Sequence, residues 1–336
     1  MSSAKQTQTN SEDYLRMYRQ MVRIRTFEDN ANQLYLSAKM PGLTHMYSGE
    51  EAVAVGICEA LKVSDKITST HRGHGHCVAK GAAFKELCLQ AALQVQDGRP
   101  GYGILCDNRI GRSALHKATG TGLWIGRPTE RPGLRPIEFE PELGEDLGKF
   151  REWARENVVK LLVFVHPDDD VETQQEHITR VKRLFTAARR NGLEFLLEII
   201  PSKVGPVDDE TSAILIQSFY DAGVYPDWWK LEPFKTEAAW QNAVEAIERN
   251  DPRTRGIVVL GLDAPEAELA ASFALAAKQP LVKGFAVGRT IFGDAARAWL
   301  KSEMADDAAV AQMAERYTRL CEIWDKARAA ARLNVE

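Results

Sequence analysis

From residue 84 onward the chain repeats one pattern, in which a short apolar run is followed by a stretch of helical periodicity. Apolar runs without strict alternation are typical of strands that are buried on both faces of a parallel sheet. The runs cover 103–107, 124–128, 158–165, 194–200, 227–232, 256–262 and 281–287. Strands that alternate with crossover helices, here 170–191, 211–222, 238–249 and 264–278, predict an α/β fold. We expect a (β/α)8 TIM-barrel-like domain over 84–330 in which one strand is not recognisable.

Three polar residues interrupt these apolar runs. Lys160 lies within VVKLLVFV, Glu198 within FLLEII and Lys230 within WWKLEP. Each lies one β/α unit after the last, so we expect them on consecutive strands with side chains that meet inside the barrel. A buried lysine is costly unless it is paired.

Two interpretations of these residues stay open at this point. One lysine forms an imine with a carbonyl substrate, Glu198 moves protons, and the other lysine lowers the pKa of the first. Alternatively, the three charges form an ion cluster that only fixes the core. Lys230 follows Trp228 and Trp229, and loss of hydration among such side chains lowers the pKa of an amine.

The last two strands predict a phosphate site. Gly261 closes one strand, and Gly288 and Arg289 follow the next. In (β/α) barrels the loops after the last two strands commonly bind phosphate through backbone N–H groups. Gly288 permits close approach and Arg289 supplies charge, although Gly288 could merely turn the chain.

Further polar residues follow the early strands. Asp107 ends the run 103–107 and is followed by Asn108 and Arg109, while Arg127 lies near the end of 124–128 and Glu130 two residues beyond it. Because catalytic sites of these barrels lie at the carboxyl ends of the strands, we expect these five residues to face the same mouth, where they could hold substrate hydroxyls. The substrate-binding residues predicted among them are Asp107, Arg109 and Arg127.

Composition excludes several classes of partner. The 336-residue chain has a net charge of −4, which argues against nucleic acid and anionic membranes as partners. No apolar run approaches the roughly 20 residues that a membrane-spanning helix needs. Five scattered cysteines without a CxxC pair suggest reduced thiols and a cytoplasmic location. Residues 1–10 have the composition of a disordered leader.

The segment 11–83 has a different, mostly helical character. Helical periodicity predicts helices over 11–39 and 49–61. His71, His74 and His76 have a spacing that could suit a metal ion, but no carboxylate accompanies them, so we expect no metal. The acids of 166–170 are better explained as a helix cap.

This segment carries the strings MPGLTHMYSGEEAVAVGICEAL and DKITSTHRGHGHCVAKG. They resemble the N-terminal part of the alpha subunit of thiamine-diphosphate-dependent 2-oxoacid dehydrogenases. The resemblance implies that Arg72 contacts the cofactor diphosphate and that His74 lines the active-site mouth. The chain lacks the GDG…N segment that carries magnesium in that family, so we expect no thiamine chemistry and no cofactor.

A second resemblance covers about 84–330, through LCDNRIG, WIGRPTE, VVKLLVFVHPDDD, GVYPDWWKLEP and KGFAVGRTIFGDAARAWL. This part looks like the aldolase domain fused behind the sugar kinase of bacterial myo-inositol catabolism, which is similar to class I tagatose-bisphosphate aldolases. The resemblance implies that Lys230 forms the Schiff base, with Lys160 and Glu198 beside it. It implies a metal-free cleavage of 2-deoxy-5-keto-gluconate 6-phosphate, a phosphorylated sugar acid, to dihydroxyacetone phosphate and malonate semialdehyde.

The sequence departs from this family before residue 84. The kinase is absent, and the first barrel strand, which ends in Asp-His-Arg in the family, is missing or substituted, with 66–72 as the β-prone candidate. An unclosed barrel exposes an edge, which favours a homo-oligomer. The alternatives to an aldolase are a dehydrogenase alpha-like component and an inactive fusion protein.

Overall fold

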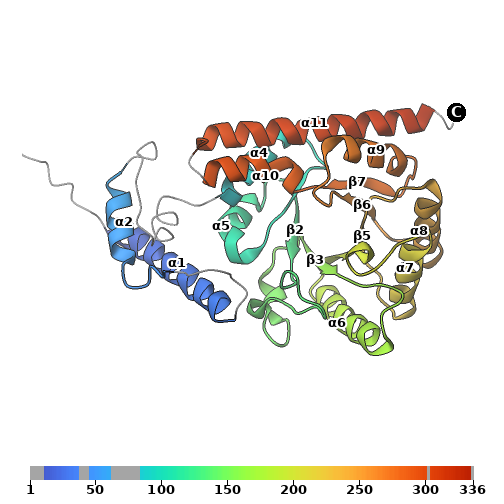
Figure 1. Ribbon diagram of the computed structural model, residues 1–336, viewed down its shortest axis with the longest axis horizontal. Coiled ribbons are helices and arrows are strands. Elements are labelled where there is room, and N and C mark those ends of the chain that lie inside the picture. The colour runs from blue at the N-terminus through green and yellow to red at the C-terminus, as the bar shows by residue number, and fades with distance from the viewer. Residues whose placement is uncertain (1–10, 38–44, 62–83, 301–302, 334–336) are drawn as a thin grey trace, which may run out of the picture. The chain divides into compact units, whose positions relative to one another are not determined.

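The computed structural model describes residues 11–37, 45–61, 84–300 and 303–333. Contacts between residues divide the chain into two compact units, Met1–Ala83 and Phe84–Glu336. Figure 1 labels the elements of both. Among the described residues no helix is long and apolar enough to cross a membrane.

The N-terminal unit contains helices α1 (Ser11–Leu36) and α2 (Glu51–Glu59). Their shared core is small and consists of Ile24, Tyr47, Ala54 and Val55. Arg25 on α1 pairs with Glu51 on α2 at 2.5 Å. The expected strand over 66–72 lies outside the described residues.

The C-terminal unit is built on seven parallel strands that follow one another around the sheet in chain order. The prediction of a TIM-barrel-like α/β fold is therefore confirmed, and the barrel is nearly closed. Most strands are one or two residues shorter than expected. They are β1 (Gly103–Leu105), β2 (Trp124–Pro128), β3 (Asn157–Val163), β4 (Glu194–Ile199), β5 (Trp228–Leu231), β6 (Gly256–Leu260) and β7 (Val282–Ala286).

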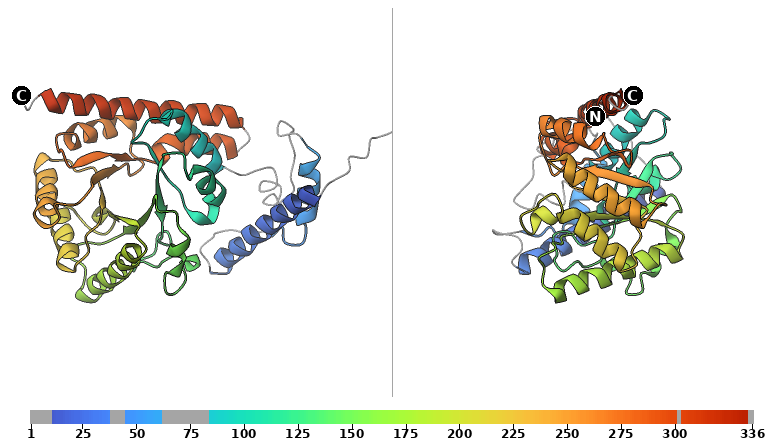
Figure 2. Two further views of the ribbon diagram at one scale, coloured as in Figure 1. Left: turned by 180° about the vertical axis from the view of Figure 1, so that it is seen from behind. Right: turned by 90° about the vertical axis from the view of Figure 1, so that its right-hand side faces the viewer.

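Helices surround these strands on the outside, as the two views of Figure 2 show. The sequence also predicts helices at 84–95 and after Gly288, which correspond to α4 and α10, whereas α5 and α11 were not predicted. The helices are α4 (Phe84–Gln96), α5 (Asn108–Ala118), α6 (Val171–Arg190), α7 (Thr211–Asp221), α8 (Glu237–Asn250), α9 (Glu266–Ala276), α10 (Arg289–Leu300) and α11 (Asp306–Leu333), with the short 3₁₀ helices η1 (Pro141–Leu143), η2 (Gly148–Glu152) and η3 (Pro201–Lys203).

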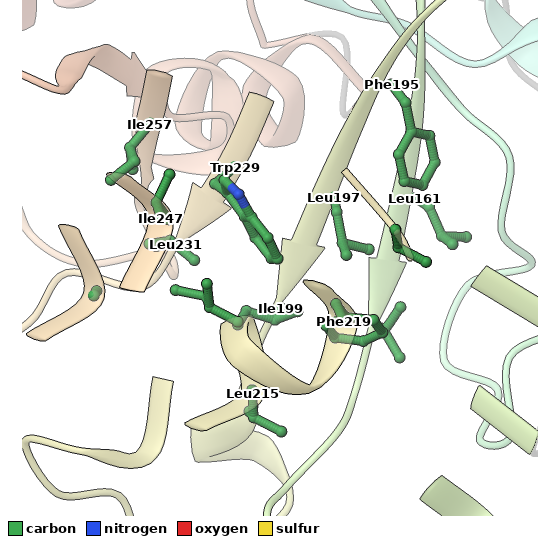
Figure 3. Packing of buried hydrophobic residues seen from close by; sticks show 14 of the residues in the cluster. Leu161, Phe195, Leu197, Ile199, Leu215, Phe219, Trp229, Leu231, Ile247 and Ile257 are labelled. Carbon is green, nitrogen blue, oxygen red and sulfur yellow. The ribbon is translucent and has the colours of Figure 1, made fainter. Parts of the chain in front are cut away.

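The main core lies between the outer face of the strands and the helices. Figure 3 shows Trp229 and Leu197 from the strands beside Phe219 of α7, and Phe195 next to Leu161. The Trp229 indole N–H donates to the Tyr220 hydroxyl at 3.0 Å, so its one polar atom is satisfied in the core. Alternate strand residues point the other way, into the barrel.

Strands β1 and β7 form the two edges of the sheet. Helix α11 packs beside α4, α10 and α9 (Figure 1) and covers both edges from outside. The ring of Tyr317 on α11 contacts Tyr102, next to β1, at 6.0 Å between ring centroids, and Phe285 of β7 at 6.4 Å. Side chains rather than a backbone ladder therefore join the two edges among the described residues.

The interior of the barrel is tight at Gly126 of β2. A Cβ at this position would lie 2.4 Å from Leu105 Cδ2 and 2.8 Å from the Trp124 ring. We predict that Gly126→Ala lowers the free energy of unfolding by about 1–3 kcal/mol, the usual cost of overpacking. Urea titration followed by tryptophan fluorescence measures it, because the seven tryptophans all lie between 124 and 324.

Gly284 of β7 is the matched control, since a Cβ there meets nothing within 4 Å. Gly284→Ala should leave the free energy of unfolding within about 1 kcal/mol of the parent. Leu105→Ala added to Gly126→Ala should recover part of the loss. Equal effects of the two glycine substitutions would contradict the packing assigned to Gly126.

Candidate active site

Four charged side chains meet inside the barrel and form a continuous chain of ion pairs. Lys160 Nζ lies 2.5 Å from Glu130 Oε1 and 2.8 Å from Glu198 Oε2. Lys230 Nζ lies 2.9 Å from Glu198 Oε1. All four residues are at least nine-tenths buried. The structure thus brings together Lys160, Glu198 and Lys230, as the sequence predicted, and adds Glu130.

Strand register explains why these side chains share the interior. Glu198 of β4 pairs with Lys230 of β5, so both point to the same side of the sheet. Lys160 of β3 pairs with Pro128 of β2. Glu130 follows Pro128 by two residues, which carries it to the same face. A period of two from Gly126 through Pro128 to Glu130 was the sequence signal for this fourth member.

The two lysines differ in their surroundings. Burial opposes the charge of Lys160, yet Glu130 and Glu198 together raise the pKa of its ammonium. For Lys230, burial is the largest cause and lowers the pKa, and the nearby charge of Lys160 acts in the same direction against Glu198. Lys160 therefore stays protonated, while Lys230 is the lysine that more readily becomes a free amine.

Glu198 is held as a carboxylate. Burial acts to raise its pKa, but the charges of Lys160 and Lys230 outweigh burial and lower it. Glu232, two residues after Lys230, is different, because burial raises its pKa while Ser202 donates to it through N–H and hydroxyl. Glu198 is thus the ionised carboxyl group of the two, and Glu232 is the one that is more readily protonated.

A cavity of about 750 Å³ opens onto Lys230. Its lining includes Trp124 and Trp228 inside the barrel, edges of β1 and β7, and Gly288. This volume is typical of sites for small molecules. Lys230 and residues at the start of α10 therefore line the same cavity.

The structure places the remaining predicted residues as follows, beginning with the end of β1. Asp107 lies 3.3 Å from Lys85 Nζ of α4. Lys85 also lines the cavity, and sequence reasoning missed it because it belongs to a helix rather than a strand. Arg109 lies in α5, with its side chain outside the described part of the structure.

Arg127 is not brought to the other members of the site. It pairs in register with Val159, one residue before Lys160, so it points to the outer face of the sheet. Its guanidinium stacks on Trp153 at 3.6 Å and donates to Asn157 at 3.0 Å. Burial lowers the pKa of Arg127 to about 10.

The three residues expected to bind phosphate lie at the loops after β6 and β7. Gly261 approaches Val287, Gly288 precedes α10, and the exposed Arg289 pairs with Asp263 at 3.2 Å. Leu262 and Asp263 both have positive φ, an uncommon backbone state that is frequent at functional sites. Gly288, but not Arg289, lines the cavity that contains Lys230.

The histidine-rich loop cannot be placed, because Arg72 and His74 lie outside the described residues. In the described parts of the chain no three His, Cys, Asp or Glu side chains gather as a metal site. Asp170 caps α6 by accepting from Thr173 N–H at 2.8 Å, which confirms the cap predicted for that acidic run.

Comparison with known families identifies the class of the chain. Residues 59–328, which include all seven described strands, match the model of a family described as "Uncharacterized protein conserved in bacteria (DUF2090)". The match spans more than half of the chain, so the chain belongs to this family.

Curated relatives match a shorter stretch. The alpha subunit of acetoin:2,6-dichlorophenolindophenol oxidoreductase from Bacillus subtilis is 57% identical over 70 residues, 21% of either chain. The pyruvate dehydrogenase E1 alpha subunit of Rhizobium meliloti is 46% identical over 76 residues, 23% of this chain and 22% of that one. The chain therefore spans about a fifth of the length of these relatives.

Among solved structures, fructose-bisphosphate aldolase from Plasmodium falciparum, in complex with TRAP and an inhibitor, is similar with a TM-score of 0.53. The alignment covers 74% of this chain and 82% of the aldolase at 16% identity. At this identity the likeness shows the fold, an aldolase-like barrel.

The charge chain predicts a large effect of Glu198→Gln on stability. Loss of this carboxylate leaves two buried ammonium groups with one acid, and removal of one partner of a buried pair costs about 3–5 kcal/mol. Urea titration at pH 7 measures the loss. Glu194→Gln is the control on the same strand, because Glu194 pairs with the exposed Arg255, and it should cost less than about 1 kcal/mol.

The pH dependence has a defined sign. Since the folded state lowers the pKa of Glu198, its contribution is present above the unfolded value of about 4.3 and is lost as pH falls toward the folded value. The parent should therefore lose more stability between pH 5 and pH 2 than Glu198→Gln. Parallel pH profiles would contradict this.

Proposed function

We propose that the protein is a class I aldolase, a carbon–carbon lyase that forms a Schiff base at Lys230. The observation that carries the proposal is the unequal pairing of two buried lysines, in which Lys160 contacts two carboxylates and Lys230 contacts one and opens onto the cavity. A desolvated lysine with a lowered pKa beside a second cation is an activated nucleophile.

The reaction begins when the Lys230 amine adds to the substrate ketone and water leaves, which yields an iminium ion. The bond between the α and β carbons then breaks, and its electron pair passes into the iminium to form an enamine. Glu198 takes the proton of the β-hydroxyl, and the first product leaves as an aldehyde. Protonation of the enamine carbon and hydrolysis of the imine release the ketone product and restore Lys230.

Lys160 serves this reaction as a fixed cation. Its two carboxylate partners keep it protonated, so it donates hydrogen bonds to oxygen atoms that gain negative charge. Glu130 is a positioning residue that acts through Lys160. Its carboxylate keeps Lys160 protonated, so Lys160 does not compete with Lys230 as a nucleophile toward the substrate.

The proposed substrate is a phosphorylated keto sugar acid, 2-deoxy-5-keto-gluconate 6-phosphate, as the resemblance to the aldolases of myo-inositol catabolism suggests. Cleavage between C3 and C4 yields malonate semialdehyde and dihydroxyacetone phosphate. Gly288 and Arg289 would bind the phosphate at the start of α10. Lys85, which lines the cavity, and its partner Asp107 would contact the other end of the substrate.

We propose no role for thiamine diphosphate in this reaction. The chain matches only about a fifth of the length of its pyruvate dehydrogenase relatives. It also has no GDG…N segment to hold magnesium. A dehydrogenase alpha-like component and an inactive fusion stay as alternatives, as does association into a homo-oligomer.

Borohydride trapping tests the proposal. Incubation with dihydroxyacetone phosphate and sodium borohydride should add one reduced triose phosphate at Lys230, located by peptide mass spectrometry. Lys230→Met should abolish both the adduct and the cleavage activity. Lys278→Met is the control, since Lys278 is an exposed lysine paired with Glu237. An adduct at another lysine, or none, would refute the assignment.

Glu130→Gln tests the division of labour between the two lysines. With one carboxylate left for both ammonium groups, the pKa of Lys160 should fall, and borohydride should then trap adducts at Lys160 as well as Lys230. The kcat should drop about 10-fold or more, as loss of charge stabilisation predicts. Glu138 is an exposed acid paired with Arg131, so Glu138→Gln is the control and should give adducts at Lys230 alone. Trapping at Lys230 alone in both variants would remove Glu130 from the mechanism.

A further inference from the structure

A second cavity, with a different set of lining residues, lies on the outer surface between η2 and α6. It has a volume of about 490 Å³. Four cations line it, Arg151, Lys182, Arg183 and Arg190, against one carboxylate, Asp146. The formal charge of the lining residues is therefore +3 on a chain whose net charge is −4. We refer to this cavity as the basic groove.

The sequence of α6 produces this concentration of charge. Thr179, Lys182, Thr186 and Arg190 are spaced by three or four residues and Arg183 follows Lys182 directly, so all five lie on one side of the helix. Opposite them, η2 contributes Arg151. Long cationic side chains and threonine hydroxyls thus surround the same hollow.

Elsewhere in the barrel, most such cations have an acidic partner. Arg180 pairs with Glu176 and Arg189 with Asp227 on the same helix α6. Within the described residues Arg151, Lys182 and Arg190 pair with no acid, and Arg183 donates only to the carbonyl of Glu145. Like charges in one hollow repel one another, and an anion that lies between them relieves this repulsion.

The wall of the groove also carries backbone strain. Leu147 has a φ of 58°, a left-handed conformation that is unfavourable for leucine, and its side chain is buried in the main core. This residue turns the chain into η2. The Asp146 carboxylate accepts from Gly148 N–H at 2.9 Å, so the acid is engaged in shaping the turn. The groove is thus held in shape by the fold.

We propose that the basic groove is a binding site for a small oligophosphate, such as a diphosphate or triphosphate group, separate from the aldolase site. Several linked phosphates match several cations that have no acidic partner, and arginine and lysine are the common ligands of phosphate oxygens. The volume admits a triphosphate or a nucleotide. Nothing in the reaction proposed above uses these residues.

Calorimetric titration of the full chain with inorganic tripolyphosphate tests the site. We expect saturable binding that weakens at least tenfold between 20 mM and 200 mM NaCl, because the contacts are exposed charges. Orthophosphate should bind at least tenfold more weakly. Equal affinity for the two anions, or no saturable binding at 20 mM NaCl, would overturn the proposal.

Two sets of variants locate the binding. The pair Lys182→Glu and Arg190→Glu should weaken tripolyphosphate binding at least tenfold. The pair Arg253→Glu and Lys326→Glu makes the same change of charge at exposed positions away from the groove and should leave affinity within about twofold. Arg289→Glu, at the candidate phosphate site of the barrel mouth, should also leave it unchanged.

Equal weakening by both pairs would show general charge attraction and refute the groove as a site. Loss of binding in Arg289→Glu without loss in the groove pair would assign the anion to the barrel mouth instead. Aldol activity is not a readout in these titrations, so failure of the aldolase proposal leaves this test intact.

Discussion

Four buried charges, alternating in sign across three strands and the end of a fourth, are the constraint around which the barrel is organised. Each ion has lost most of its hydration, so each needs its neighbours in place. Glu198 is central, because it bonds both lysines, and Glu130 completes the set so that acids and lysines are equal in number. The apolar packing of Trp229, Phe195 and Leu161 on the opposite strand faces fixes the register that makes this possible.

The sequence was most informative where periodicity and chemistry agreed. Apolar runs located the strands, because strands buried on both faces leave an uninterrupted signal, and the polar interruptions located Lys160, Glu198 and Lys230. The ends of strands were less certain, since the last residues of a run can continue into a loop without a change in composition. Helix α5 was not predicted, because its first residues, Asn108 and Arg109, are polar and follow directly on the end of a strand.

Other features could not be derived from composition and spacing. Arg127 lies on a strand at the expected place. Side chains alternate along the strand, however, and the side chain of Arg127 points to the outer face, where its guanidinium stacks on Trp153. The contact of Glu130 with Lys160 depends on how two strands align, which is a property of the folded sheet. The basic groove combines η2 with α6, whose residues are separated by about 30 positions, and only the structure shows that they meet.

The seam between β1 and β7 is held differently from the rest of the barrel. Six strand pairs are joined by backbone ladders, whereas across the seam Tyr317 of α11 touches aromatic rings on either side. Aromatic contacts can slide through small displacements, while ladder hydrogen bonds break. At this seam the packing of side chains, rather than ladder hydrogen bonds, holds the described strands β1 and β7 together. Residues of β1, β7 and α11 line the same cavity as Lys230, so the side chains that pack at the seam also form part of the wall of the candidate site.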